Sequence, residues 1–200
     1  MFSKEYIKMG YQKYVQQLWK QPRKNMNQSY RNLLVQWRKE NSIERVEHPT
    51  RIDRARRLGF RAKQGFVIAR VRVKRGSKNN ASLKKGRDGG NMTTRIANSK
   101  SYKWIAEERA QKRFPNLEVL NAYWVGQDEK SIWHEVILVD VYHPQIVNDS
   151  NINWIVASNN TKRAHRGLTS AGKKSRGLRN KGLGAEKVRP GLRANSRRLR

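Results

Sequence analysis

The chain has 200 residues, with 45 Lys and Arg against 15 Asp and Glu, and its formal net charge is +30. A charge of this size repels itself in a compact state, so it predicts a polyanionic partner, most commonly nucleic acid. The absence of cysteine excludes disulfides and thiolate metal sites. No apolar run approaches the length of a transmembrane helix and the N-terminus lacks a signal-peptide core, so we expect a cytoplasmic protein without membrane partners.

The charge is distributed in blocks along the chain. Residues 50–100 contain 16 basic and 2 acidic residues and residues 161–200 contain 14 and 1, whereas residues 101–160 contain 5 and 8. This layout is typical of a folded core with basic arms. We therefore expect one globular domain over 1–160, with a basic loop at 76–98, and a C-terminal extension over 161–200 that becomes ordered on RNA.

Two amphipathic helices are predicted near the N-terminus. The first ends before Pro22, and the second covers the residues after it. Their apolar stripes comprise Ile7, Tyr11, Tyr14, Val15 and Leu18, then Tyr30, Leu33, Leu34 and Trp37. Helical spacing favours a core or helix–helix role for these aromatic residues over stacking on bases.

A basic stretch and a strand follow. Six cations crowd the residues from Arg51 to Lys63, which predicts a connector laid on phosphate. From Val67 to Lys74 the residues alternate between apolar and basic types. The odd-numbered positions of this strand should therefore face a core, and Arg70, Arg72 and Lys74 should face outward towards RNA.

The middle of the chain predicts an α+β fold. A helix over 102–114 is closed by Pro115, with Glu108 and Lys112 spaced to form an ion pair. Strands over 119–125 and 132–142 are separated by a hairpin-length loop. Residues 136–139 are apolar at every position, which calls for cover on both sides of a strand. We expect a small antiparallel or mixed sheet flanked by helices.

One segment comes close to a nucleotide-binding loop. Residues 167–175, GLTSAGKKS, nearly match G-x-x-x-x-G-K-[ST], but Lys174 stands where a hydroxyl should bind magnesium. No buried strand precedes the segment and no amphipathic helix follows it. The sequence therefore favours a basic tail whose glycines allow close approach to RNA.

No catalytic or metal-binding arrangement is predicted. Glu135 and Asp140 lie five positions apart on a strand and so point to opposite faces. The histidines are scattered without the spacing of a metal site; they are His48, His134, His143 and His165. We expect no enzyme activity, no metal, no cofactor and no small-molecule substrate.

Several blocks of the sequence resemble a known family. They are RARRLGFRAKQGFVIARVRVKRG at 54–76, AEERA at 106–110, VLNAYWVGQD at 119–128, EVILVDVYHP at 135–144 and GLTSAGKKSRGL at 167–178. Together they resemble the archaeal and eukaryotic large-subunit ribosomal protein family fifteen-e. The resemblance implies an α+β fold with an antiparallel sheet, a structural role, and burial among large-subunit ribosomal RNA and neighbouring ribosomal proteins. Residues 76–98 and those after Leu178 match no firm motif.

The candidate RNA-binding residues are the cations of the basic blocks. They are Arg51, Arg54, Arg56, Arg57, Arg61, Lys63, Arg70, Arg72, Lys74, Arg75, Lys84, Lys85, Arg87, Arg163, Arg166, Lys173, Lys174, Arg176 and Arg179. A DNA-packaging or other non-ribosomal nucleic-acid-binding protein is the alternative, although the sequence contains no docking helix or repeat. Stacking of Trp19, Trp104 or Trp154 on bases is left open.

Overall fold

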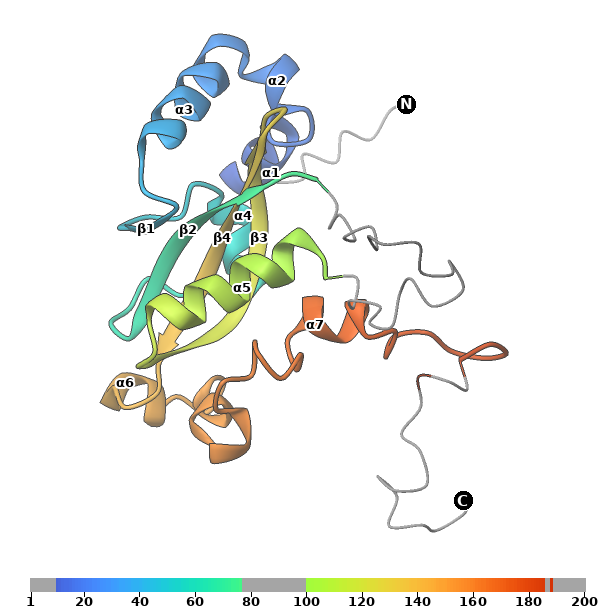
Figure 1. The fold of residues 1–200 in the computed structure, drawn as a ribbon. Helices are drawn as coiled ribbons and strands as arrows, with labels where there is room; N and C mark the ends of the chain where they lie inside the picture. The colour runs from blue at the N-terminus through green and yellow to red at the C-terminus, as the bar shows by residue number, and fades with distance from the viewer. Residues whose placement is uncertain (1–9, 77–99, 186–187, 189–200) are drawn as a thin grey trace, which may run out of the picture.

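The computed structural model describes residues 10–76, 100–185 and 188. At its centre is a four-stranded sheet in the order β1-β2-β4-β3, in which every neighbouring pair is antiparallel (Figure 1). The strands are β1 (Ile43–Val46), β2 (Phe66–Lys74), β3 (Leu117–Gln127) and β4 (Ser131–Asp140). The predicted α+β fold and the predicted hairpin between β3 and β4 are therefore confirmed.

Helices lie on both sides of this sheet, as the wholly apolar run in β4 required. They are α1 (Tyr11–Leu18), α2 (Pro22–Asn25), α3 (Asn27–Lys39), α4 (Ile52–Arg57), α5 (Tyr102–Arg113), α6 (Pro144–Val147) and α7 (Ser170–Ser175). Two short 3-10 helices, η2 (Asn153–Val156) and η3 (Ser158–Asn160), connect α6 to the C-terminal segment.

One face of the sheet is covered by α5. Ala106 and Ala110 are fully buried against β2, β3 and β4, in a cluster that includes Ala69, Val71 and Val73. Small residues on the helix allow it to approach the sheet closely, and Ser101 caps its first turn by accepting from the Trp104 N–H. The predicted helix and the predicted core face of β2 are both confirmed. Glu108 forms an ion pair with Lys100 at 2.7 Å, so the predicted pair between Glu108 and Lys112 is wrong.

The N-terminal helices and α4 cover the opposite face. Tyr30, Leu34 and Trp37 of α3 are buried there, as their helical spacing predicts. The same prediction is wrong for α1, because Tyr11, Tyr14 and Leu18 are 53%, 56% and 39% exposed. The contacts of this N-terminal region with the core come from Val15 and from Trp19 just after α1.

The outer edge of β3 is covered by side chains. Gln111 on α5 donates to the Leu117 carbonyl at 2.5 Å and accepts from the Val119 N–H at 3.2 Å. Arg163 donates to the carbonyls of Val119 and Leu120 at 2.8 and 3.0 Å. These bonds satisfy backbone groups that would otherwise be open to another strand.

The segment from residue 161 onwards differs from the expected extension without a fold of its own. Ala164, Thr169 and Ala171 are buried, and the Trp104 indole N–H donates to the Ala164 carbonyl at 2.7 Å. Figure 1 shows the segment running from η3 alongside α5 to α7. The expectation that this segment has no fold of its own is thus wrong for residues 161–176. They dock on α5 through small side chains and backbone groups, which produce no apolar stripe in the sequence. Residues 189–200 lie outside the described residues.

Candidate RNA-binding surface

Three arginines form an exposed group on α4. Burial of Asp53 and Ala55 fixes the orientation of this helix, and Arg54, Arg56 and Arg57 are left exposed. All three lie in its last turn, where cations interact favourably with the helix dipole. Arg57 donates to Gln16 at 3.0 Å, and no carboxylate within the described ranges pairs with any of the three. The sequence predicted a connector rather than a helix at these positions. The six residues of α4 are too few to show a periodic apolar stripe.

A second exposed group of cations follows from α7. Lys173, Lys174, Arg176 and Arg179 are all exposed. Arg176 donates to the Gly167 carbonyl at 3.2 Å and Arg179 to the Ser170 hydroxyl at 2.5 Å. Because both acceptors are uncharged, the positive charges remain available to an anion.

A buried contact fixes the position of α7. The Thr169 hydroxyl donates to the Glu107 carboxylate on α5, and both side chains are fully buried. Burial raises the pKa of Glu107, and the hydrogen bond from Thr169 and the charges of Lys103 and Arg163 oppose that rise. Ser101, at the start of α5, also donates its N–H to the Ser175 hydroxyl at 3.3 Å. The second cationic group is therefore held on the folded core.

The same region gives a structural reason for the spacing that resembles a nucleotide-binding loop. Gly167 has a φ of +67°, and a Cβ on Gly172 would lie 2.6 Å from the Gly167 Cα. The two glycines are therefore required where this turn touches α7. Thr169 caps α7 by accepting from the Gly172 N–H at 3.2 Å and is fully buried. The glycine spacing is explained by packing.

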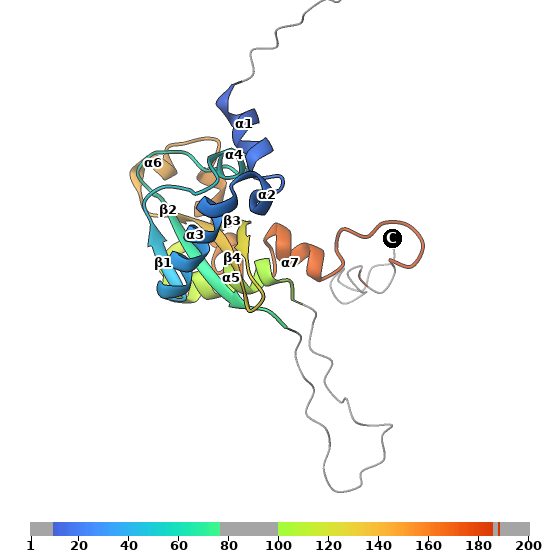
Figure 2. The same ribbon diagram turned by 90° about the horizontal axis from the view of Figure 1, so that it is seen from above.

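Charges of the α4 group and of the group that follows α7 both reach one side chain of α5. Lys103 on α5 donates to Asn121 of β3 at 2.7 Å. The pKa of Lys103 is lowered by burial, Glu107 opposes this change, and the charges of Arg54 and Arg179 lower it further. Both arginines are therefore close enough to Lys103 for their charges to act on its ammonium group, and Figure 2 shows α7 on the side of the sheet away from β1.

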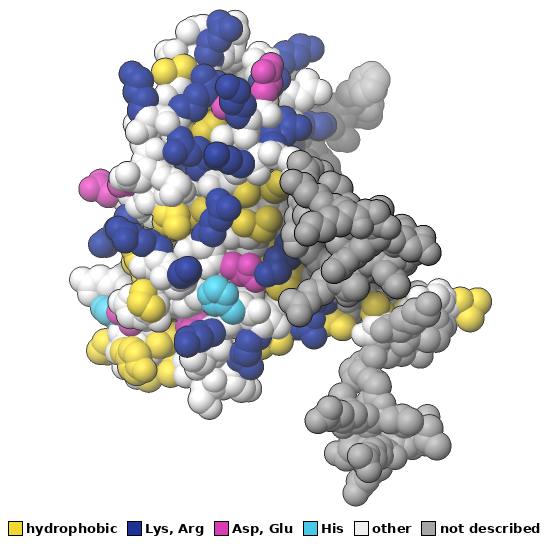
Figure 3. All heavy atoms as spheres, in the orientation of Figure 1, with side chains coloured by type: hydrophobic (Ala, Val, Ile, Leu, Met, Phe, Trp, Pro, Cys, Tyr) yellow, Lys and Arg dark blue, Asp and Glu magenta, His cyan; other side chains and the backbone are white. Residues whose placement is uncertain are grey.

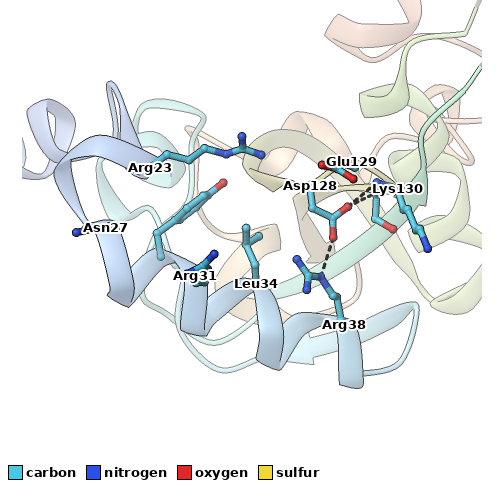
Figure 4. A pocket seen from close by; sticks show the side chains of 10 residues that line it. Arg23, Asn27, Arg31, Leu34, Arg38, Asp128, Glu129 and Lys130 are labelled. Carbon is cyan, nitrogen blue, oxygen red and sulfur yellow. Dashed lines mark hydrogen bonds and ion pairs between the residues drawn. The ribbon is translucent and has the colours of Figure 1, made fainter.

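A third cationic group was not predicted from the sequence. Arg23, Arg31, Arg38 and Lys130 surround a hollow of about 790 Å³ between α3 and the turn that joins β3 to β4 (Figure 4). Arg38 pairs with Asp128 at 2.8 Å, whereas Arg31 and Lys130 pair with no described carboxylate. Figure 3 shows Lys and Arg side chains gathered over these N-terminal helices. On the sequence, these arginines were indistinguishable from an ordinary solvated helix face.

Arg70 corrects the predicted outward face of β2. Its side chain is only 11% exposed and forms a two-pronged ion pair with Glu40, at 2.9 to 3.1 Å. It also lies 3.8 Å from the fully buried Glu135 carboxylate and 4.8 Å from the centre of the Trp37 ring. Burial raises the pKa of Glu135, and hydrogen bonds from Thr50 and Tyr123 and the charge of Arg70 oppose this effect. The outward prediction is wrong for Arg70 because α3 covers this part of the sheet.

Two further candidate arginines are occupied by the fold. Arg51 donates to the Trp124 carbonyl at 3.2 Å and stacks on Trp19 at 5.2 Å. Arg163, which caps the edge of β3, stacks on Trp154 at 5.0 Å. Burial lowers the pKa of both guanidinium groups. Trp19 and Trp104 are themselves buried, at 6% and 4% exposure, so neither offers a ring face to a base.

The remaining candidates divide by their partners. Lys63 is paired with Asp149 and also donates to the Gln145 carbonyl at 3.2 Å. The side chains that donate to carbonyl groups alone are Arg61, Arg72, Arg75 and Arg166. Lys74, at the end of β2, is exposed. Lys84, Lys85 and Arg87 lie outside the described residues.

The described residues contain no cluster of three or more His, Asp or Glu that could hold a metal ion. No helix among them is long and apolar enough to cross a membrane. Glu135 and Asp140 lie on one strand as predicted, with Glu135 buried beneath Arg70 and Asp140 paired in register with Leu117 at the far end. They do not form a paired catalytic site.

Comparison with protein-family models identifies a family that extends across this fold. A model described as Ribosomal L15, of the L15e type, matches residues 10–195. The match covers the sheet, α5 and the docked C-terminal segment, and it agrees with the sequence blocks quoted above. The chain belongs to the L15e family of large-subunit ribosomal proteins.

Proposed function

We propose that this chain is a structural component of the large ribosomal subunit that binds ribosomal RNA through its exposed cationic groups and acts in the cytoplasm. The RNA-binding surface consists of the α4 group, the α7 group and the group around the hollow beside α3. Arg51, Arg70 and Arg163, whose side chains are bonded within the fold, hold the domain together instead.

The observation that carries this proposal is the separation of cations into two sets. Arg51, Arg70 and Arg163 are largely buried and bonded within the protein, whereas Arg54, Arg56 and Lys174 are exposed without ion-pair partners among the described residues. Exposed cations fixed on short helices present an array of charges to a phosphate backbone, and their binding releases counterions. This arrangement favours nucleic acid as the partner, and the family favours RNA over packaged DNA.

The experiment measures the affinity of the full chain for RNA extracted from its own large subunits, as a function of salt. The variant Arg54→Gln/Arg56→Gln removes two charges from the α4 group. The matched control Lys112→Gln/Arg113→Gln removes two exposed charges from the end of α5. Each lost phosphate contact should make the slope of log affinity against log salt shallower by about 0.7 to 0.9.

The α4 variant should therefore change the slope by about 1.5, and the control should change it by much less. Equal changes in the two variants would show that total charge, rather than this surface, sets the affinity. Thermal unfolding of both variants should match that of the parent chain, since surface changes usually alter stability by less than about 0.5 kcal/mol.

A further inference from the structure

One stretch of this strongly basic chain contains no cation. Residues 131–161 include Glu135, Asp140 and Asp149 but neither Lys nor Arg. The first part of the stretch is β4, whose side chains are mostly buried. The remainder forms α6, η2 and η3 at the end of the sheet, and this part supplies surface.

The surface of this stretch is apolar around α6. Tyr142 is 85% exposed and Val147 is 44% exposed, with exposed Pro144 between them in the chain. We call these three residues the α6 patch. Figure 3 shows hydrophobic side chains gathered at the lower left, where Figure 1 places α6. Val156 of η2, which packs against α6, is also exposed, at 37%.

The patch is not required by the core beneath it. Ile146, Ile152 and Ile155 already close this end of the sheet around Val139. Exposed apolar groups that do not serve the fold are typical of a surface that contacts a partner.

The described cations that bond to or stack on α6 and η2 are engaged within the protein. Lys63 reaches this region, but it is paired with Asp149. Arg163 also reaches it, but its guanidinium stacks on Trp154 and donates to two carbonyls of β3. Asp140, next to the patch, accepts a hydrogen bond from the Tyr142 N–H and has no cationic partner among the described residues. Carboxylates beside an apolar surface complement a polypeptide that carries both apolar and basic side chains.

We propose that the α6 patch is a docking site for a basic segment of another protein in the ribosomal particle. The site goes beyond the proposed RNA binding, because it assigns protein contact to a surface on the cation-free stretch. Apolar contact through Tyr142, Pro144 and Val147 supplies the affinity, and Asp140 favours a cationic partner.

The test uses the full chain assembled into ribosomes in its own cells, with the photoreactive residue p-benzoylphenylalanine in place of Val147. After irradiation, purified large subunits are treated with ribonuclease or protease, and the crosslinked species is sequenced by mass spectrometry. The same photoreactive residue in place of Lys174 on α7 is the control for RNA contact. Two further variants, Tyr142→Lys and Tyr142→Glu, carry opposite charges beside position 147.

Position 147 should crosslink to a polypeptide with Lys or Arg close to the attachment point. Both variants lose the apolar contact of Tyr142, so the test is their difference: the crosslink yield should be about fivefold lower with Tyr142→Lys than with Tyr142→Glu. The proposal would be overturned if position 147 crosslinked to RNA or gave no crosslink at all. It would also be overturned if the yield with Tyr142→Lys were equal to or higher than the yield with Tyr142→Glu. Failure of the Lys174 control to reach RNA would instead count against the proposed RNA surface, so the two failures are distinguishable.

Discussion

The hydroxyl of Thr169 donates a hydrogen bond to the carboxylate of Glu107, joining residues 62 positions apart that are both fully buried. This contact fixes the C-terminal segment on α5 and so positions the cations of α7.

Replacement of Thr169 by Val should separate the C-terminal segment from α5. The variant keeps the shape of the side chain but removes the hydroxyl, which among the described residues is the one hydrogen-bond partner of the buried Glu107 carboxylate, at a cost of about 1 to 3 kcal/mol. Hydrogen exchange should show loss of protection over residues 164–176, with β4 little affected. Thr169→Ser keeps the hydroxyl and should retain that protection. Unchanged exchange in the Val variant would mean that the contact does not hold the segment.

The raised pKa of Glu107 predicts a pH dependence that Glu107→Gln should remove. An unfolded chain ionises this carboxyl near its ordinary pKa of 4.5, whereas burial keeps the folded protein protonated to a higher pH. The contribution of Glu107 to the free energy of unfolding is therefore fully present below pH 4.5. It is lost as the pH rises through the pKa that Glu107 has in the folded protein. Urea unfolding from pH 4 to 8 should show the Gln variant gaining stability relative to the parent chain with rising pH. A constant difference would contradict the assignment.

Loss of Arg70 should destabilise the domain. Arg70→Gln leaves the Glu135 carboxylate buried without its cation and breaks the pair with Glu40, so we expect a loss of about 3 kcal/mol. Lys74→Gln, at the exposed end of the same strand, should cost less than about 0.5 kcal/mol. Chemical denaturation of both variants provides the comparison. If the two variants were equally stable, Arg70 would not have the structural role assigned to it.

His134 should make the protein sensitive to mild acid. Burial lowers the pKa of this histidine to about 4, and the charge of Lys103 adds to the effect. Its contribution to stability is therefore present above pH 6.5 and is lost as pH falls from 6.5 towards 4, by at most about 3 kcal/mol. His134→Gln should reduce the fall in melting temperature over this range. His165→Gln, at an exposed position, is the matched control and should leave the fall unchanged.

Elements with strong local signals could be predicted from the amino-acid sequence. The period-two alternation from Val67 to Lys74 located β2 and its core face, and the Tyr102 to Pro115 stripe located α5. The uninterrupted apolar run at 136–139 required cover on both sides of the sheet, which the structure provides. The uneven charge distribution indicated nucleic acid as the partner, because net charge is a property of composition and does not depend on the fold.

Which cations are available to a partner could not be predicted from the sequence, because it depends on contacts between distant parts of the chain. Arg70 meets Glu40 across 30 positions, and Lys63 meets Asp149 across 86. The Thr169 to Glu107 contact likewise converted an expected tail into a docked segment. Periodicity assigns a side chain to one face of an element, but it carries no information about what covers that face. An ion pair or a buried hydrogen bond depends on groups distant in the chain that only folding brings within about 3 Å.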